Sequence, residues 1–250
     1  MKVTEHITAL KGAGERLAMA SASAGLDHPV PSCPEWLVRD LLHHISGVHR
    51  WATSFVATGR ERMTTGEEDA DYFATVPDGE LLSWYRDGLA SLVSTLSTAQ
   101  PDLQCWTFLD APSPLAFWAR RQSHETAIHC ADAEASAGAS SRFDCQFAAD
   151  GIDELLSCFF TRPGGRLVAD PPLALGIRAT DADQAWTIRI EAGRRVVSAG
   201  VADSDCQLSG PASDLYLLLW NRRDPDPPIR VDGDAAAWDL WQSTATIKWS

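Results

Sequence analysis

The spacing of apolar residues predicts helices over the first two thirds of the chain. An Ala-rich amphipathic helix is expected over residues 3–24. The next helix is predicted to begin at Ser32, which precedes Glu35 by three residues as in a capping box, and to end near Gly59. A polar loop is expected over residues 60–77. Further helices are predicted from Asp78 past Leu96, over residues 113–137 and over residues 147–160. This pattern predicts an N-terminal bundle of four or five helices.

The helical pattern ends at Arg162–Gly165, where Pro and Gly suggest a linker. Short alternating runs follow and predict an antiparallel meander. The expected strands cover residues 173–180, 185–191, 195–201 and 229–232, and the expected short helices cover residues 215–220 and 235–242. The sequence therefore predicts an α+β protein with a helical domain over residues 1–161 and a small α/β domain over residues 166–250.

Composition and charge narrow the class of partner. The 250 residues are 45% hydrophobic and carry 21 Lys and Arg against 34 Asp and Glu, a net charge of −13. This balance argues against nucleic acid and anionic membranes as partners. Residues 1–25 do not resemble a secretory signal, and no apolar run approaches the roughly 18–20 residues of a membrane span. We expect a cytoplasmic protein. The six Cys form no C-x-x-C pair, which argues against thiolate zinc knuckles and thioredoxin-type motifs. A chain of this length can bury a core without a disulfide scaffold, so the six thiols are expected to be reduced.

Two short windows contain five of the seven His. In the first window, His44 lies on the apolar stripe with Leu41 and Val48, so it is expected to point into the bundle. His43 is expected to face solvent, and His49 to lie at the edge of the stripe. A single inward His is more often a core residue than a metal ligand.

The second window resembles an H-E-x-x-H motif, but His124 and His129 are five residues apart and point about 140° away from each other on a helix. Glu125 and His129 are four residues apart and share a face. That face is a polar line along the predicted helix, made of Trp118, Gln122, Glu125, His129 and Asp132. Taken alone, the line is typical of a solvated face with a Glu–His pair.

Taken together, the two windows indicate a metal site. His44, Glu125 and His129 would supply two imidazoles and one carboxylate, which suits a catalytic zinc ion with one open coordination position. Such a centre has a net charge of about +1 and can hold a bound thiol or water as its anion. His124 and Asp132 are candidates for outer partners of the ligands or for surface positions.

The same residues resemble a known family. The segment Pro31–Trp51 is similar to the opening signature of the mycothiol-dependent maleylpyruvate isomerase family, which reads P-x-C-P-x-W-x-V-x-D-L-x-x-H-L-x-G-V-H-R-W. The segment Arg120–His129 resembles the second signature, A-H-E-T-x-x-H. The resemblance implies a DinB-like four-helix bundle followed by a small sterol-carrier-like α/β domain. That domain would include Leu219–Arg223 and Val231–Asp234.

The resemblance also implies roles for individual residues. The metal ligands would be His44, Glu125 and His129, in agreement with the helical-face argument. Mycothiol would be the co-substrate, and Arg222 and Arg223 are candidates for basic residues that close over the site and clamp a carboxylate. Cys130 departs from the pattern, since many relatives carry Arg there. It is expected to be a neighbour of the site rather than a ligand.

Three functions fit these residues. The first is cis–trans isomerisation of an unsaturated acid by reversible addition of a low-molecular-weight thiolate. The second keeps the metal and the thiol but conjugates the thiol to an electrophile, as a mycothiol S-transferase would. The third is a non-catalytic module that binds a metal or a small molecule. It is disfavoured because closed structural zinc sites have four protein ligands, and only three are found here.

Overall fold

The computed structural model describes residues 1–63 and 69–245 and divides the chain into two compact units, Met1–Ser141 and Arg142–Ser250. The first unit is helical, and the second combines a sheet with short helices, so the predicted α+β class is confirmed. Residues 64–68, in the middle of the predicted polar loop, lie outside the described residues.

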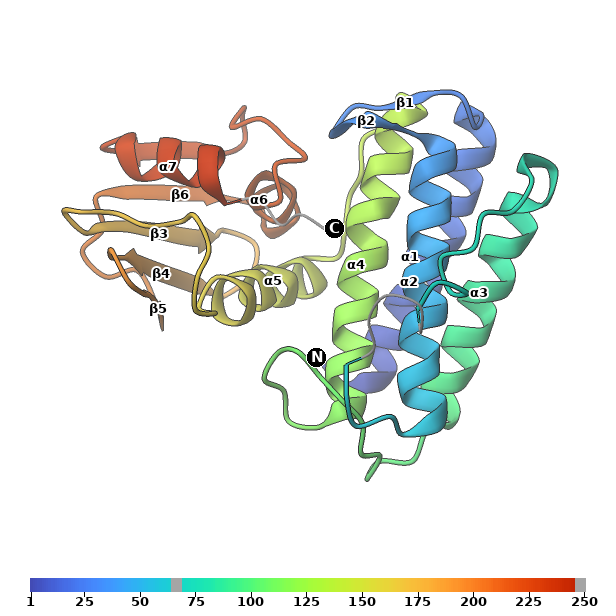
Figure 1. The fold of residues 1–250 in the computed structure, drawn as a ribbon. Helices are drawn as coiled ribbons and strands as arrows, with labels where there is room; N and C mark the ends of the chain where they lie inside the picture. Colours follow the sequence, from blue (N-terminus) through green and yellow to red (C-terminus); the bar gives the residue numbers. More distant parts are fainter. Residues whose placement is uncertain (64–68, 246–250) are drawn as a thin grey trace. The chain divides into compact units, whose positions relative to one another are not determined.

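Four long helices form the first unit (Figure 1). They are α1 (Val3–Ala24), α2 (Val38–Thr58), α3 (Asp78–Thr98) and α4 (Pro114–Ser136). Helix α1 packs mainly against α4, and α2 packs mainly against α3. The start of α4 follows the expected chemistry, because the Ser113 hydroxyl accepts a hydrogen bond from the Ala116 amide at 3.2 Å and Pro114 occupies the first turn.

A short hairpin replaces the first turns of the helix predicted to begin at Ser32. Its strands are β1 (Pro29–Val30) and β2 (Cys33–Leu37), paired antiparallel, and α2 begins only at Val38. The helix start predicted at Ser32 is therefore wrong. At the observed start of α2, the Leu37 amide donates a hydrogen bond to Asp40 Oδ2 at 2.8 Å. The Ser32 hydroxyl instead donates to Asp132. The Ser–Glu spacing resembles a capping box without forming one.

Five strands form the mixed sheet of the second unit. Their order is β5-β4-β3-β6-β7. The bounds are β3 (Leu173–Ala179), β4 (Ala185–Ile190), β5 (Arg195–Ala199), β6 (Cys206–Gly210) and β7 (Arg230–Gly233). The first three form the expected antiparallel meander, whereas β6 was not predicted and lies parallel to β3. This parallel pair corrects the expectation of a purely antiparallel sheet.

Short helices complete the second unit. They are α5 (Cys145–Asp153), which continues into a π-helical turn (Glu154–Phe159), α6 (Ala212–Leu219) and α7 (Ala236–Thr244). Helix α5 packs against α6, and α7 packs against the sheet at β3 and β6. The predicted linker at Arg162–Gly165 therefore lies within this unit, some twenty residues after the division at Ser141.

An aromatic cluster fills one end of the helical unit. Trp118 is fully buried and has its ring 5.2 Å from that of Phe55 and 5.3 Å from that of Trp51. Its Nε1 donates to the backbone oxygen of Trp106 at 3.1 Å. The rings of Trp106, Phe108 and Phe117 complete the cluster. These contacts fasten α2 to α4 through large apolar surfaces.

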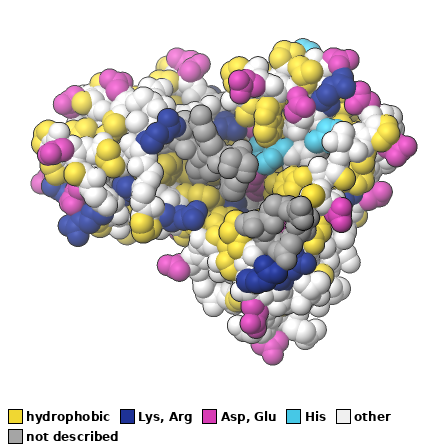
Figure 2. Space-filling view, viewed as in Figure 1, with side chains coloured by type: hydrophobic (Ala, Val, Ile, Leu, Met, Phe, Trp, Pro, Cys, Tyr) yellow, Lys and Arg dark blue, Asp and Glu magenta, His cyan; other side chains and the backbone are white. Residues whose placement is uncertain are grey.

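The exterior of both units is acidic without being uniform. Figure 2 shows Asp and Glu side chains scattered over the drawn face, with Lys and Arg side chains between them. On this face the negative charge of the chain is not gathered into one patch. Among the described residues, no helix combines the length and the apolar character that crossing a membrane requires.

Candidate metal centre

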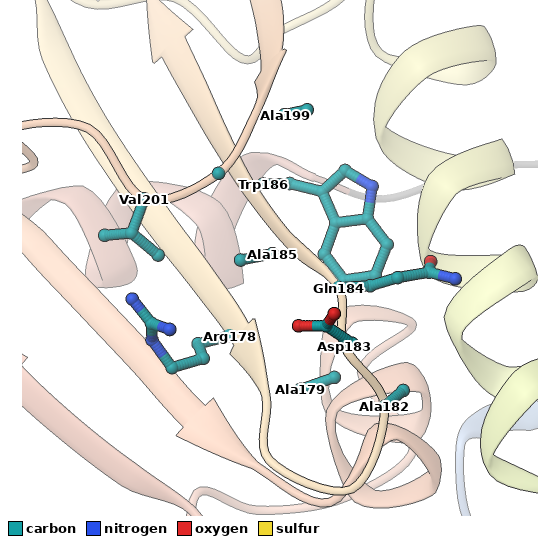
Figure 3. A pocket seen from close by; sticks show the side chains of 10 residues that line it. Arg178, Ala179, Ala182, Asp183, Gln184, Ala185, Trp186, Ala199 and Val201 are labelled. Atoms are coloured by element: carbon teal, nitrogen blue, oxygen red, sulfur yellow. The ribbon is translucent and has the colours of Figure 1, made fainter.

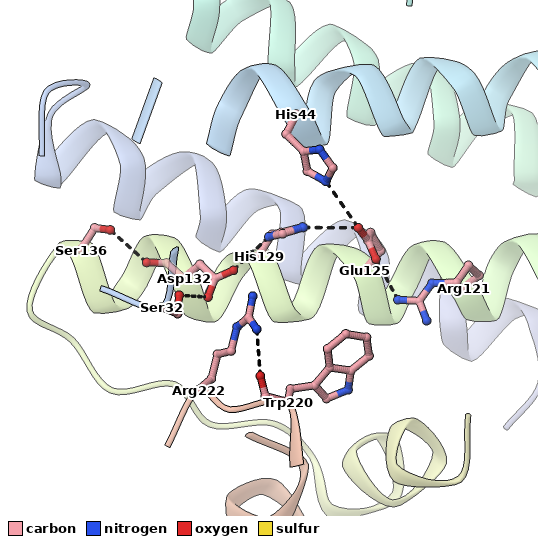
Figure 4. A network of polar contacts seen from close by, with 9 residues as sticks. All are labelled: Ser32, His44, Arg121, Glu125, His129, Asp132, Ser136, Trp220 and Arg222. Carbon is pink, nitrogen blue, oxygen red and sulfur yellow. Dashed lines mark hydrogen bonds and ion pairs between the residues drawn. The ribbon is translucent and has the colours of Figure 1, made fainter. Parts of the chain in front are cut away.

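His44, Glu125 and His129 come together between α2 and α4 (Figure 4). His44 projects from the first half of α2, and the other two residues lie one turn apart on α4. Glu125 Oε1 is 3.3 Å from His129 Nε2 and 3.6 Å from His44 Nε2, and the potential ligand atoms of all three lie within 4.8 Å of one another. The structure thus brings the three predicted ligands to one point.

The donor set fits a divalent metal. Ligand atoms that bind a tetrahedral zinc ion at about 2.0 Å are about 3.3 Å apart, close to the separations found around Glu125 Oε1. Both His44 Nε2 and Glu125 Oε1 are buried and make no hydrogen bond. Burying such atoms without a partner costs free energy, and a cation bound between them would remove that cost.

Neighbouring side chains orient two of the three donors. His129 Nδ1 is 3.0 Å from Asp132 Oδ2, so its Nε2 is turned toward Glu125. Arg121 Nη2 donates to Glu125 Oε2 at 3.0 Å, which leaves Oε1 toward the two imidazoles. Outer partners of this kind fix the tautomer and orientation of metal ligands. The sequence suggested Asp132 in this role but missed Arg121, although Arg121 precedes Glu125 by four residues on the same helical face.

Burial and charge set different protonation states within the cluster. Burial acts to raise the pKa of Glu125, but the nearby imidazoles of His129 and His44 and the charge of Arg121 outweigh it and hold this pKa well below 4.5. Burial lowers the pKa of His44 despite the nearby Glu125. In His129, burial is outweighed by the hydrogen bond to Asp132 and by the nearby carboxylate of Glu125, which raise its pKa to about 9. Metal binding at neutral pH would therefore displace a proton from His129.

The polar line on α4 is buried rather than solvated. The side chains of the line are all in the interior: Trp118, Gln122, Glu125, His129 and Asp132. Helix α4 is packed against α1 on one side and against α2 and the β1 strand on others, which leaves little of it in contact with water. The alternative of a solvated face with a Glu–His pair is therefore wrong.

The remaining histidines of the two windows lie outside the donor group. His124 is fully buried, with its ring 5.7 Å from that of His6. His43 is half-buried, with its ring 6.3 Å from that of Trp84, so it does not simply face solvent as expected. His49 is fully buried, not at the edge, and its Nε2 lies 2.8 Å from the Thr126 hydroxyl.

His49 predicts an acid sensitivity of the fold. Burial lowers its pKa from 6.5 to about 3. Between these values the unfolded chain binds a proton that the folded chain excludes, so the free energy of unfolding falls as the pH falls. From pH 7 to pH 5 we expect His49 to account for a loss of about 2 kcal/mol. Urea unfolding of the metal-free protein at both pH values measures this loss.

The variant His49→Gln serves as the comparison, since an amide can keep the bond to Thr126 without titrating. We expect its free energy of unfolding to fall less between pH 7 and pH 5 than that of the unmodified protein. Equal losses in the two proteins would show that His49 is not held neutral by the fold.

Cys130 follows His129 in the sequence but is not among the converging donors of the described residues. It is buried, and its pKa is raised to about 12, first by burial and then by the nearby charge of Glu134. The expectation that Cys130 is a neighbour rather than a ligand agrees with this placement.

In the second unit, both candidate Arg side chains have partners close by. Arg222 Nη1 donates to the Trp220 backbone oxygen at 2.8 Å (Figure 4), and Arg223 Nη1 is 2.9 Å from Asp214 Oδ1. Their predicted role as a clamp for a substrate carboxylate stays a prediction.

The second unit also contains a cavity of about 460 Å³ at the turn between β3 and β4 (Figure 3). Arg178 and Asp183 are the charged residues that line it, and the Trp186 indole borders it. Trp186 Nε1 donates to Asp153 Oδ1 at 3.2 Å. The lining contains neither His nor Cys, so the cavity lacks the imidazole donors of the centre on α2 and α4.

Comparison with known proteins identifies the family and the fold of the chain. Residues 7–134 match the family described as the mycothiol maleylpyruvate isomerase N-terminal domain, and residues 146–240 match the MDMPI C-terminal domain. A crystal structure of the mycothiol-dependent maleylpyruvate isomerase is 14% identical, with 93% of each chain covered and a TM-score of 0.62. A histidine-to-alanine mutant of that isomerase is 13% identical, with the same coverage and TM-score. These likenesses establish a shared fold. No curated protein matches. The two domain matches, which together span most of the described residues, show that the chain belongs to the mycothiol-dependent maleylpyruvate isomerase family.

Proposed function

We propose that this protein is a thiol-dependent metalloenzyme that uses mycothiol as co-substrate and a divalent metal, zinc, bound by His44, Glu125 and His129. The observation that carries the proposal is the convergence of these donors, two of which are buried without a hydrogen-bond partner. Membership of the family supports the dependence on mycothiol.

The three ligands leave one coordination position for an external molecule. When bound, the metal would supply the positive charge that lowers the pKa of a thiol and holds it as thiolate. Asp132 would keep the Nδ1 proton of His129 in place, and Arg121 would neutralise the Glu125 oxygen that does not face the imidazoles. The residues of the chain thus bind and orient, while the nucleophilic sulfur comes from the co-substrate.

The proposed reaction is the cis–trans isomerisation of an unsaturated acid such as maleylpyruvate. The thiolate adds to the cis double bond, the resulting single bond rotates, and elimination of the thiolate restores the double bond as the trans isomer. No atom is gained or lost, and the thiol is regenerated. Arg222 and Arg223 are proposed to bind the carboxylate of the substrate, for which the planar guanidinium fork is suited.

An assay of the zinc-loaded protein with maleylpyruvate, with and without mycothiol, tests the proposal. We expect a product of unchanged mass that forms only when the thiol is present, while the thiol concentration stays constant. Protein stripped of metal by a chelator is the control and should be inactive. Turnover that does not require mycothiol would contradict the proposal.

A conjugase is the second candidate, because S-conjugation would use the same ligands and the same thiol. It would consume one thiol per turnover and give a product that carries the thiol, either by addition or with loss of a leaving group from the electrophile. A non-catalytic module is less well supported, since three protein ligands leave a position open that a structural site would close. Small-molecule partners, the absence of nucleic acid and membrane partners, and a cytoplasmic location stay predictions from the sequence.

A further inference from the structure

The β1–β2 hairpin contacts the candidate metal centre through a serine. Ser32, in the turn between the strands, donates its hydroxyl to Asp132 Oδ1. The other oxygen of the same carboxylate, Oδ2, lies 3.0 Å from His129 Nδ1. A continuous path of hydrogen bonds therefore joins Ser32 to a candidate ligand almost a hundred residues later in the chain.

Because Asp132 is buried, this path of hydrogen bonds sets the orientation of its carboxylate. Its side chain is fully buried, so the carboxylate depends on protein donors to replace water. With Oδ1 engaged by the Ser32 hydroxyl, Oδ2 is directed at the imidazole of His129. A carboxylate without this bond could rotate and pull the Nδ1 proton out of line, and the Nε2 lone pair would then no longer point at the metal.

A second residue of the hairpin also packs against the centre. The Trp36 ring has its centroid 5.0 Å from that of His44 and 6.3 Å from that of His129, nearly parallel to the latter at 24°. The hairpin thus contacts the imidazoles with an apolar surface and the outer carboxylate with a hydroxyl. Its sequence places both groups within five residues of each other.

We propose that Ser32 is a positioning residue of the metal centre, which acts through Asp132 to hold His129 in the orientation that binds the metal. The proposal rests on the metal site proposed above. It assigns to Ser32 a function that the capping-box pattern of the sequence concealed.

Zinc affinity, measured by competition with a chromophoric chelator, tests the proposal. We expect Ser32→Ala to weaken zinc binding by about 10-fold, at the lower end of the 10–100-fold effect of outer partners. Ser32→Thr retains the hydroxyl and should restore the affinity. The matched control is Ser136→Ala, because the Ser136 hydroxyl donates to the backbone oxygen of Asp132 at 3.0 Å rather than to its carboxylate. It should leave the affinity unchanged.

A second measurement on the metal-free protein separates this inference from the metal site itself. The Nδ1 proton of His129, held by Asp132, should give a slowly exchanging NMR signal. Ser32→Ala should speed its exchange, and Ser136→Ala should not. A wild-type protein that binds no zinc would overturn the metal site, while the exchange rates would still decide the role of Ser32. If Ser32→Ala has the same zinc affinity and the same exchange rate of the His129 Nδ1 proton as the wild type, the inference is overturned.

Discussion

Replacing His44 by Ala is expected to deprive the protein of its metal. The substitution removes one of three ligands and leaves Glu125 and His129, which lie on one helix and cannot surround an ion. Loss of a residue that only hydrogen-bonds a metal ligand lowers metal affinity by up to about 100-fold. Loss of the ligand His44 itself should lower the affinity for zinc by more than that. Metal per chain, measured by mass spectrometry after dialysis against limiting zinc, should fall from close to one to near zero. Glu125→Gln and His129→Ala should act in the same direction.

The neighbouring His43→Ala provides the matched control. His43 lies against Trp84 and outside the donor group, so its loss should leave the metal content unchanged. Full metal retention in all three ligand variants would remove the basis of the site. Strong loss in His43→Ala would show that the wrong face of α2 has been assigned to the metal.

Replacing Trp118 by Ala is expected to lower the free energy of unfolding by about 3–5 kcal/mol, the range for truncation of a buried aromatic residue. The indole is fully buried among the rings of α2 and α4, so its removal would leave a cavity in the aromatic cluster. Glu125 lies seven residues further along α4, about 10 Å away. The variant should therefore still bind zinc where it remains folded.

Urea unfolding of the metal-free protein measures the loss. Trp118→Phe should lose less, because a ring remains in the cluster. Trp84→Ala is the comparison, since Trp84 is only partly buried and lies under the Arg50 guanidinium at 3.7 Å. A loss in Trp118→Ala no larger than that in Trp84→Ala would show that the aromatic cluster does not carry the stability assigned to it.

The helices of the first unit could be predicted because local chemistry and the apolar period agree. Ser113 and Pro114 mark the start of α4, and the apolar stripe of α2 places His44 inward, as the structure has it. The hairpin could not be predicted in this way. Ser32 and Glu35 satisfy the spacing of a cap, and only the contact with Asp132 shows that the Ser32 hydroxyl serves a distant partner.

The burial of the polar line on α4 also could not be predicted from the sequence. Periodicity reports where polar residues lie around a helix but not whether water or protein covers them. Helix α4 is covered by its neighbours, so Gln122 and Asp132 become interior groups. Strand β6 could not be predicted for a different reason. A run of five alternating residues is too short to distinguish from a loop. Its parallel pairing with β3 depends on the sheet as a whole.

The state of Cys130 has a consequence for chemical selectivity. The thiolate is the form of cysteine that reacts with electrophiles, and a thiol with a pKa of about 12 is ionised in only about one molecule in 10⁵ at neutral pH. The protein thus places a cysteine directly after a candidate ligand and keeps it inert. An electrophile that meets an activated external thiol at this centre would be consumed by that thiol and would leave Cys130 unmodified. The burial that raises the pKa of Cys130 would thus protect the proposed enzyme from modification by its own substrate.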